Sequence, residues 1–156
     1  MIRPIDRVLL DDVSREARNA ARGRKNRNFH IHDAQPAHRL LNAIEPGSYI
    51  MPHRHLDPAK DETVVVLRGR LGLVVFDDAG TIAQTLLLGP DLDAQGVDIA
   101  HGTWHTVLAL ATDTVFLEAK AGPYVPLSVA EKAPWAPEEG SVDAPAYLSQ
   151  LRSRFD

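Results

Sequence analysis

The sequence predicts an all-β protein, folded as a sandwich or a small barrel, with one helix in front of it. Between Phe29 and Leu127 the chain consists of short runs of β-branched and aliphatic residues separated by turn residues. These runs recur at nearly regular spacing, which is typical of antiparallel layers and not of alternating strands and helices. The length of 156 residues suits one domain with a buried core of its own.

The composition excludes several classes of protein. The chain has no cysteine, which rules out disulfides, iron–sulfur clusters, thiolate zinc sites and a cysteine nucleophile. Its 17 Lys and Arg against 21 Asp and Glu give a net charge of −4, so no general attraction to nucleic acid or an anionic membrane exists. No run approaches the ~18 apolar residues of a membrane span, and acids replace the apolar core of a signal peptide. We therefore expect a cytoplasmic protein that binds neither nucleic acid nor membrane.

An amphipathic helix is predicted over residues 5–21, since Leu9, Val13 and Ala17 fall on one stripe. A basic, Asn-rich connector, residues 22–28, follows it. Its positive charge fits two interpretations, a solvated connector or an anion-binding edge over the mouth of the barrel. The basic residues concerned are Arg22, Arg24, Lys25 and Arg27.

The strands and the C-terminal arm complete the division of the chain. Prolines preclude regular structure over residues 133–140, and a short helix is predicted over 145–155. The single domain therefore divides into a helix with its connector (1–28), a barrel (29–127) and an arm that packs on the barrel (128–156). The clearest strands are Thr63–Leu67, Leu71–Phe76, Ile82–Leu88, Thr106–Leu110 and Thr114–Glu118.

Four residues suggest a metal site. In an extended strand His53 and His55 point the same way, with α-carbons ~6.5 Å apart. Two imidazoles at that separation can both reach one ion at ~2.1 Å. Glu62 opens the next predicted strand, and His105 opens another far downstream. Three imidazoles and one carboxylate hold one divalent ion per chain and leave one or two coordination positions open. Fe(II), Mn(II), Ni(II) and Zn(II) all suit these ligands, and the sequence does not choose among them.

The spacing of these residues resembles the two motifs of the cupin superfamily. Gly47-x5-His53-x-His55-x6-Glu62-x6-Gly69 is similar to the first motif, and Gly96-x5-Gly102-x2-His105 to the second. The resemblance implies a cupin double-stranded β-helix, which is a jelly-roll barrel. Two features depart from the pattern: the spacer before Glu62 is longer than usual, and Ala100 stands where a proline is common.

Other side chains could compete for the metal. Asp57 and Asp61 lie in the long spacer before Glu62, whose distance to Gly69 is that of the family. A second His-x-His pair, His30 and His32, has the same strand geometry but lacks a carboxylate and a glycine in register. His101 is one residue out of phase with a ligand at the start of a strand, so we expect a loop histidine.

Within the superfamily, the chain resembles the WbuC-type cupin-fold metalloproteins. This resemblance implies a metalloprotein whose genes are often associated with bacterial O-antigen or capsule polysaccharide synthesis. The segments that carry it are Asn28-Phe29-His30, residues 42–49, Pro52–His55, Leu67–Arg70 and Pro134–Glu138.

These observations favour a metal-dependent enzyme that acts on a small polar metabolite, a sugar or sugar-derived compound. A bound ion polarises carbonyls, stabilises enediolates or activates water, and Fe(II) activates O₂, so isomerisation, epimerisation and oxygenation all stay open. The alternative is a non-catalytic, metal-dependent sensor or binding protein for a small molecule. A single N-terminal helix does not suffice for a DNA-binding helix-turn-helix.

Five residues are candidates for binding the small molecule. Asn28 and His30 share a face if extended, so we expect them at the mouth of the metal cavity, where their amide and imidazole suit sugar hydroxyls. The alternative is structural, a turn cap and a buried backbone partner. Lys60 would add a positive charge at the same rim. Glu118 and Lys120 share one face of the last strand, either as a surface ion pair or inside the barrel.

Two more expectations concern packing. Trp104 should face away from His105, toward the core or a subunit partner, and Trp135 should anchor the C-terminal arm. Val65 and Leu67 lie opposite the inward face of their strand, which is therefore apolar on both sides. A homodimer would bury that outer face, although the N-terminal helix could cover it instead.

Overall fold

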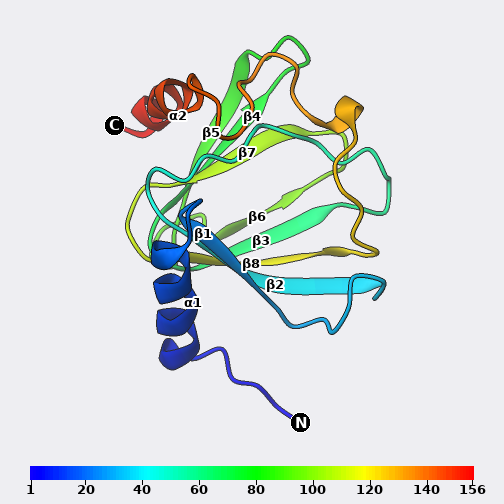
Figure 1. The fold of residues 1–156 in the computed structure, drawn as a ribbon, viewed down its shortest axis with the longest axis vertical. Helices are drawn as coiled ribbons and strands as arrows, with labels where there is room; N and C mark the ends of the chain where they lie inside the picture. The colour runs from blue at the N-terminus through cyan, green and yellow to red at the C-terminus, as the bar shows by residue number, and fades with distance from the viewer.

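The computed structural model describes residues 1–156 and contains two antiparallel sheets that face each other (Figure 1). The five-stranded sheet has the order β1-β2-β8-β3-β6, and the three-stranded sheet the order β5-β4-β7. This arrangement confirms the predicted jelly roll with an N-terminal helix and a C-terminal arm. The elements are α1 (Arg7–Asn19), β1 (Arg24–Asn28), β2 (Ala37–Ile44), β3 (Glu62–Arg68), β4 (Leu71–Phe76), β5 (Ile82–Leu88), β6 (Gly96–Ile99), β7 (Trp104–Ala109), β8 (Thr114–Ala121) and α2 (Ala144–Arg152), with 3-10 turns at Val129–Glu131 and Ser153–Phe155.

Strict alternation along β3 shows how the sequence builds the space between the sheets. Glu62, Val64 and Val66 are buried on the inner face, whereas Thr63 and Val65 are exposed on the outer one. The inner apolar residues join one core cluster with side chains from the opposite sheet. Its buried members are Ile44, Val64, Val66, Leu71, Leu73, Leu88, Ile99, Ala109 and Phe116. Burial of this face stabilises the pairing register and leaves Glu62 as a charged residue in an apolar layer.

Helix α1 covers part of the outer face of the five-stranded sheet. Its N-terminus is capped by Asp6, whose carboxylate accepts a hydrogen bond of 3.0 Å from the Leu9 amide. Val13 and Ala17 are fully buried against that face, where Leu41 and its neighbours lie. The helix therefore covers much of the outer sheet face that, from the sequence alone, a second subunit could equally have covered.

The segment predicted as a basic connector is in fact largely a strand. Residues 24–28 pair antiparallel with residues 40–44 of β2, as β1 at the edge of the sheet. Its polar composition has a physical reason, because residues on one of its faces border a cavity, and on the other face Arg27 pairs with Glu16 of α1 and Lys25 is exposed. Strands β2 and β6 were likewise not among the clearest strands in the sequence.

The C-terminal arm packs on the outer face of the three-stranded sheet. Trp135 lies edge-on against Trp104, with ring centroids 4.9 Å apart, and contacts Phe76 at 6.2 Å. Trp104 points away from His105, which confirms its predicted orientation and its place in a core cluster. Helix α2 then closes this side of the molecule (Figure 1). Neither helix has the length and apolar content needed to cross a bilayer.

The turn between β3 and β4 yields the first testable prediction. Gly69 has φ +79°, and an added Cβ would lie 2.4 Å from Thr114 Oγ1 and 2.8 Å from its α-carbon. Gly140 has a similar φ of +81°, but an added Cβ there meets nothing within 4 Å. We expect Gly69→Ala to lower the free energy of unfolding by about 3 kcal/mol and Gly140→Ala by about 1 kcal/mol. Urea denaturation of both variants measures the difference, and equal losses would contradict the steric argument.

Candidate metal centre

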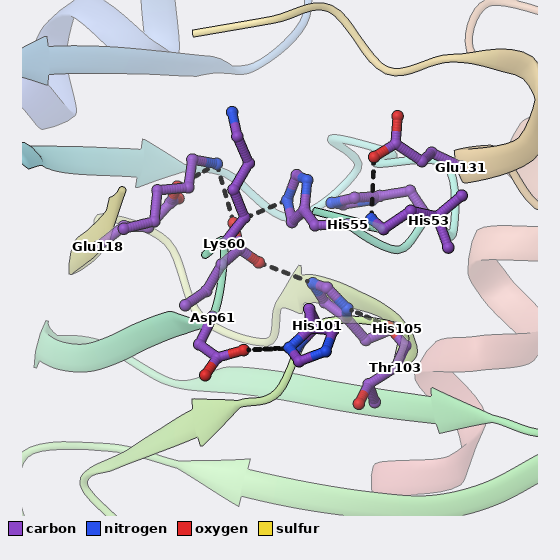
Figure 2. Close-up of polar contacts among 12 residues, drawn as sticks. His53, His55, Lys60, Asp61, His101, Thr103, His105, Glu118 and Glu131 are labelled. Atoms are coloured by element: carbon purple, nitrogen blue, oxygen red, sulfur yellow. Dashed lines mark hydrogen bonds and ion pairs between the residues drawn. The ribbon is translucent and has the colours of Figure 1, made fainter. Parts of the chain in front are cut away.

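The predicted metal ligands lie close together: Figure 2 shows the three histidines, His53, His55 and His105, and Glu62 joins them. His53 and His55 belong to the segment that joins β2 to β3, Glu62 opens β3, and His105 lies in β7 of the other sheet. One ligand atom from each of His53, His55 and Glu62 falls within 4.8 Å of the others. His105 joins this group through Glu62, since its Nε2 lies 3.1 Å from Glu62 Oε2.

Backbone hydrogen bonds hold the histidine segment against β7. The His53 amide donates to the His105 carbonyl at 3.0 Å, and the His105 amide donates back to the His53 carbonyl at 2.9 Å. Two residues further on, the Gly102 amide donates to the His55 carbonyl at 2.6 Å. Gly102 has φ +78°, a left-handed conformation that favours glycine. These bonds bring together histidines that are about fifty residues apart in the sequence.

The C-terminal arm holds the same segment from its other side. The Arg54 amide donates to the Glu131 carbonyl at 2.9 Å, and the Ala133 amide donates to the Pro52 carbonyl at 3.0 Å. Glu131 Oε1 also accepts a bond of 3.0 Å from the Leu56 amide. Hydrogen bonds from the backbone amides of Leu56 and Ser128 lower the pKa of Glu131 to about 2. The Glu131 carboxylate that holds this segment is therefore ionised at neutral pH.

Contacts at the Nδ1 atoms orient two of the imidazole rings, those of His53 and His105. His53 Nδ1 lies 3.0 Å from the Met51 carbonyl, and His105 Nδ1 lies 2.9 Å from the Thr103 carbonyl. A carbonyl oxygen only accepts hydrogen bonds, so each Nδ1 carries the proton and each Nε2 presents its lone pair. Such contacts fix the tautomer that a metal-binding histidine requires.

The charges of this group fit a divalent metal ion. His105 Nε2 lies 3.1 Å from Glu62 Oε2, so either a proton or a bound metal ion between these two atoms would hold them together. Burial and the nearby His105 lower the pKa of His53 to about 4, so this ring is neutral and available as a ligand at pH 7. Burial acts to raise the pKa of Glu62, but hydrogen bonds with His105 and His55 and the charge of Lys120 hold it below its ordinary value. Neutral imidazoles with one carboxylate are suitable donors for Fe, Mn, Ni or Zn.

A cavity of about 260 Å³ adjoins this group. Its second polar wall is a chain of hydrogen bonds: Lys120 Nζ lies 2.8 Å from Glu62 Oε1 and 2.7 Å from Glu118 Oε1. Asn42 Nδ2 donates to the other Glu118 oxygen at 2.9 Å. Glu118 and Lys120 therefore face into the barrel, which decides between the two positions that the sequence left open. The remaining lining residues are Arg22, Arg24, Asn26, Ala43, Ile44, Ile50, His53, Glu62, Val64, Ile99, His105, Val107 and Phe116.

The structure places Asn28, His30 and Lys60 away from the lining of this cavity, in contrast to the expectation from sequence. The His30 ring is buried, with its centroid 3.9 Å from that of His38. Lys60 Nζ donates to the Pro123 carbonyl at 2.6 Å. Asn28 does share the inner face of the sheet, but it lies on the edge strand, where the buried Leu40 stands between it and Glu118 of the cavity wall.

The cavity instead borders the beginning of β1, at Arg24 and Asn26, and the middle of β2, at Asn42. Sequence reasoning missed these three as site residues. The available signal was that polar side chains at every second position of a strand share one face. Only the pairing of the strands, however, shows which of these positions borders the cavity.

The competing carboxylates and histidines lie apart from the cluster. Asp61 Oδ1 accepts bonds of 2.8 Å from both the backbone amide and Nδ1 of His101, as Figure 2 also shows. Asp57 accepts from the Ala59 amide, and His32 is exposed. Glu62 is therefore the carboxylate that meets the histidines.

The metal assignment is tested by removing one ligand from each side of the site. We expect His53→Ala/His105→Ala to reduce divalent metal from about one ion per chain to trace amounts, because too few donors would remain. Elemental analysis of the purified protein is the measurement. His101→Ala is the matched control and should keep its metal; full occupancy in the double variant would refute the assignment.

Comparison with known proteins supports the fold and gives a family. The solved structure of KdgF from Halomonas sp., a cupin-fold protein, resembles the chain (16% identity, 64% of this chain and 80% of that chain, TM-score 0.51), as does that of the conserved SPY1581 protein of unknown function from Streptococcus pyogenes (15%, 68% and 80%, 0.50). A cupin-2 domain protein from Shewanella frigidimarina shows a weaker likeness (18%, 62% and 79%, 0.47). At these identities the likeness shows the fold alone, and the WbuC-type resemblance stays a prediction. No curated protein matches the chain in sequence. A family model described as a domain of unknown function matches residues 5–88, more than half of the chain, and the protein therefore belongs to this family, DUF6016, and has the cupin fold.

Proposed function

We propose that the protein is a metal-dependent enzyme that acts on a small polar metabolite, a sugar or a sugar-derived compound. The observation that carries this proposal is the cavity with two polar walls, one of metal ligands and one formed by Asn42, Glu118 and Lys120. Lys120 joins the two walls, because it contacts a ligand carboxylate and Glu118 at once.

The side chains around the cavity suit a hydroxylated ligand. We assign the metal to His53, His55, Glu62 and His105, where a bound divalent ion would polarise a carbonyl or lower the pKa of a hydroxyl group. The second wall offers donors from Lys120 and acceptors from Glu118. Its apolar floor can contact the carbon skeleton of a sugar. A volume of about 260 Å³ lies at the small end of ligand pockets, which span roughly 300–1,000 Å³, so the ligand is a small molecule.

The resemblance to WbuC-type cupins supports a sugar-derived ligand and a link to surface polysaccharide synthesis. It covers segments on both sides of the site, including the one that carries His53 and His55 and the one that carries Trp135. The matched family has no assigned activity, so the nature of the substrate rests on the cavity and on this resemblance.

Turnover by the metal-loaded protein tests the proposal. We expect conversion of at least one member of a panel of aldoses, ketoses and sugar acids, followed by NMR. Lys120→Met should lower kcat at least about 100-fold while metal content is kept, because a fixed charge beside the reacting groups is lost. Lys25→Met, on the exposed face of β1, is the matched control. Saturable binding without conversion would instead favour a sensor or binding protein.

We also propose that the protein forms a homodimer through apolar surface that α1 leaves uncovered. Val65 is 36% exposed on the outer face of β3, and Ile31, which follows β1, is 87% exposed. Closed two-fold dimers commonly bury such surface. We expect light scattering at micromolar concentration to give twice the chain mass of 17.1 kDa, and a particle of 17.1 kDa would refute the dimer.

A further inference from the structure

Arg24 places a guanidinium at the mouth of the metal cavity. It opens β1 on the inner face of the sheet, and its side chain is only 15% exposed. The cavity that it borders also touches His53, Glu62 and His105. A molecule that fills about 260 Å³ can therefore contact the metal ligands at one end and Arg24 at the other.

One edge of this guanidinium is fixed by the neighbouring loop. Arg24 Nη1 donates to the Tyr49 carbonyl at 3.1 Å and to Ser48 Oγ at 3.3 Å. The Ser48 hydroxyl in turn donates to the Arg22 carbonyl at 2.6 Å. Neither contact involves Glu139, so both can persist when the carboxylate of Glu139 is displaced. Its Nη2 atom is left to bind something else.

The group bound to Nη2 is a carboxylate of the protein itself. Glu139, in the irregular part of the C-terminal arm, accepts from Arg24 Nη2 with both oxygens, at 2.7 and 2.6 Å. The same carboxylate lies 3.3 Å from Arg22 Nη1. Glu139 is 34% exposed and does not line the metal cavity, so it reaches the arginines from outside.

The charges around the cavity favour an anionic ligand. Arg22, Arg24 and Lys120 line it as cations, and Glu62 and Glu118 as anions. Lys120 already contacts both of those carboxylates. Three cations against two anions leave one excess positive charge, which lies on the arginine side of the cavity, and a divalent ion would increase it. A carboxylate is a strong partner for a guanidinium, and Glu139 already binds Arg24 Nη2 through both of its oxygens.

We propose that Arg24, assisted by Arg22, recognises the carboxylate of a small hydroxy acid, and that Glu139 occupies this position until the ligand displaces it. The inference builds on the proposed function, since it adds the chemical class of the ligand to the metal cavity. Glu139 then acts as an internal competitor, and the arm segment that carries it as a gate over the mouth. Arg24 determines specificity, while the metal ligands determine what happens at the other end of the molecule.

Binding of D-glycerate, with uncharged glyceramide as its isosteric control, tests this inference. Calorimetry is carried out on Mn²⁺-loaded and on metal-free protein, with metal content and thermal stability measured for each variant. Arg24→Gln should weaken glycerate binding at least about tenfold and abolish the preference for glycerate over glyceramide, because a charge-assisted pair is lost. Glu139→Gln should tighten it at least about threefold, because the internal competitor is removed.

The double variant makes the test specific. In Arg24→Gln/Glu139→Gln we expect the affinity of Arg24→Gln alone, because removal of the competitor gives no gain once its site is gone. The ion pair between Arg27 and Glu16 supplies matched controls, since it joins the same strand to α1 on the opposite face. Arg27→Gln and Glu16→Gln should leave glycerate binding unchanged.

The outcomes separate this inference from the proposed function. If the protein holds no metal but still prefers glycerate through Arg24, the metal-dependent function fails and the carboxylate site stands. If metal binds and Arg24→Gln keeps the wild-type preference, the carboxylate site is overturned. It is equally overturned if neither wild type nor Glu139→Gln binds glycerate at millimolar concentrations, or if Glu139→Gln leaves the affinity unchanged.

Discussion

The carboxylate of Glu62 is the group on which the rest of the site depends. It is 5% exposed, at the start of β3 in the five-stranded sheet, yet its contacts reach the opposite sheet through His105. A buried charge is costly unless it is paired, and Glu62 meets this requirement with contacts to His55, His105 and Lys120. The two sheets are therefore joined by polar contacts in a layer that is otherwise apolar. The same contacts define where a metal and a ligand can bind.

The site was predicted from sequence to the extent that its geometry is local. Alternation along one extended segment placed His53 and His55 on one side, and the spacing of motif residues added Glu62 and His105. The ligand-binding residues depended on which strands are neighbours, which the sequence does not show directly. Asn28 was expected at the mouth because it shares a face with the correct residues, but the buried Leu40 separates it from Glu118, which lines the cavity. Arg24, four residues earlier, takes that position.

The strands, like the site, were predicted where the local sequence pattern determines the structure and missed where strand pairing determines it. Apolar, β-branched strands such as β3 and β4 were predicted because their side chains fill the core on at least one face. Strand β1 was missed because its residues are all polar or charged, the composition of a connector. It is held by backbone pairing with β2, and its inner side chains face a cavity in place of a core. A functional site is where a local rule of this kind is expected to fail.

The C-terminal arm connects the two ends of the cavity without forcing them to move together. Its first part holds the histidine segment through Glu131 and Ala133, and Trp135 anchors it on the back of β7 against Trp104. The Pro137 carbonyl still accepts a bond of 2.8 Å from the Tyr49 hydroxyl. Glu139 lies beyond these attachments and is fastened to the barrel through the arginines at the mouth. An incoming carboxylate can therefore replace Glu139 while every backbone bond that positions the metal ligands stays in place.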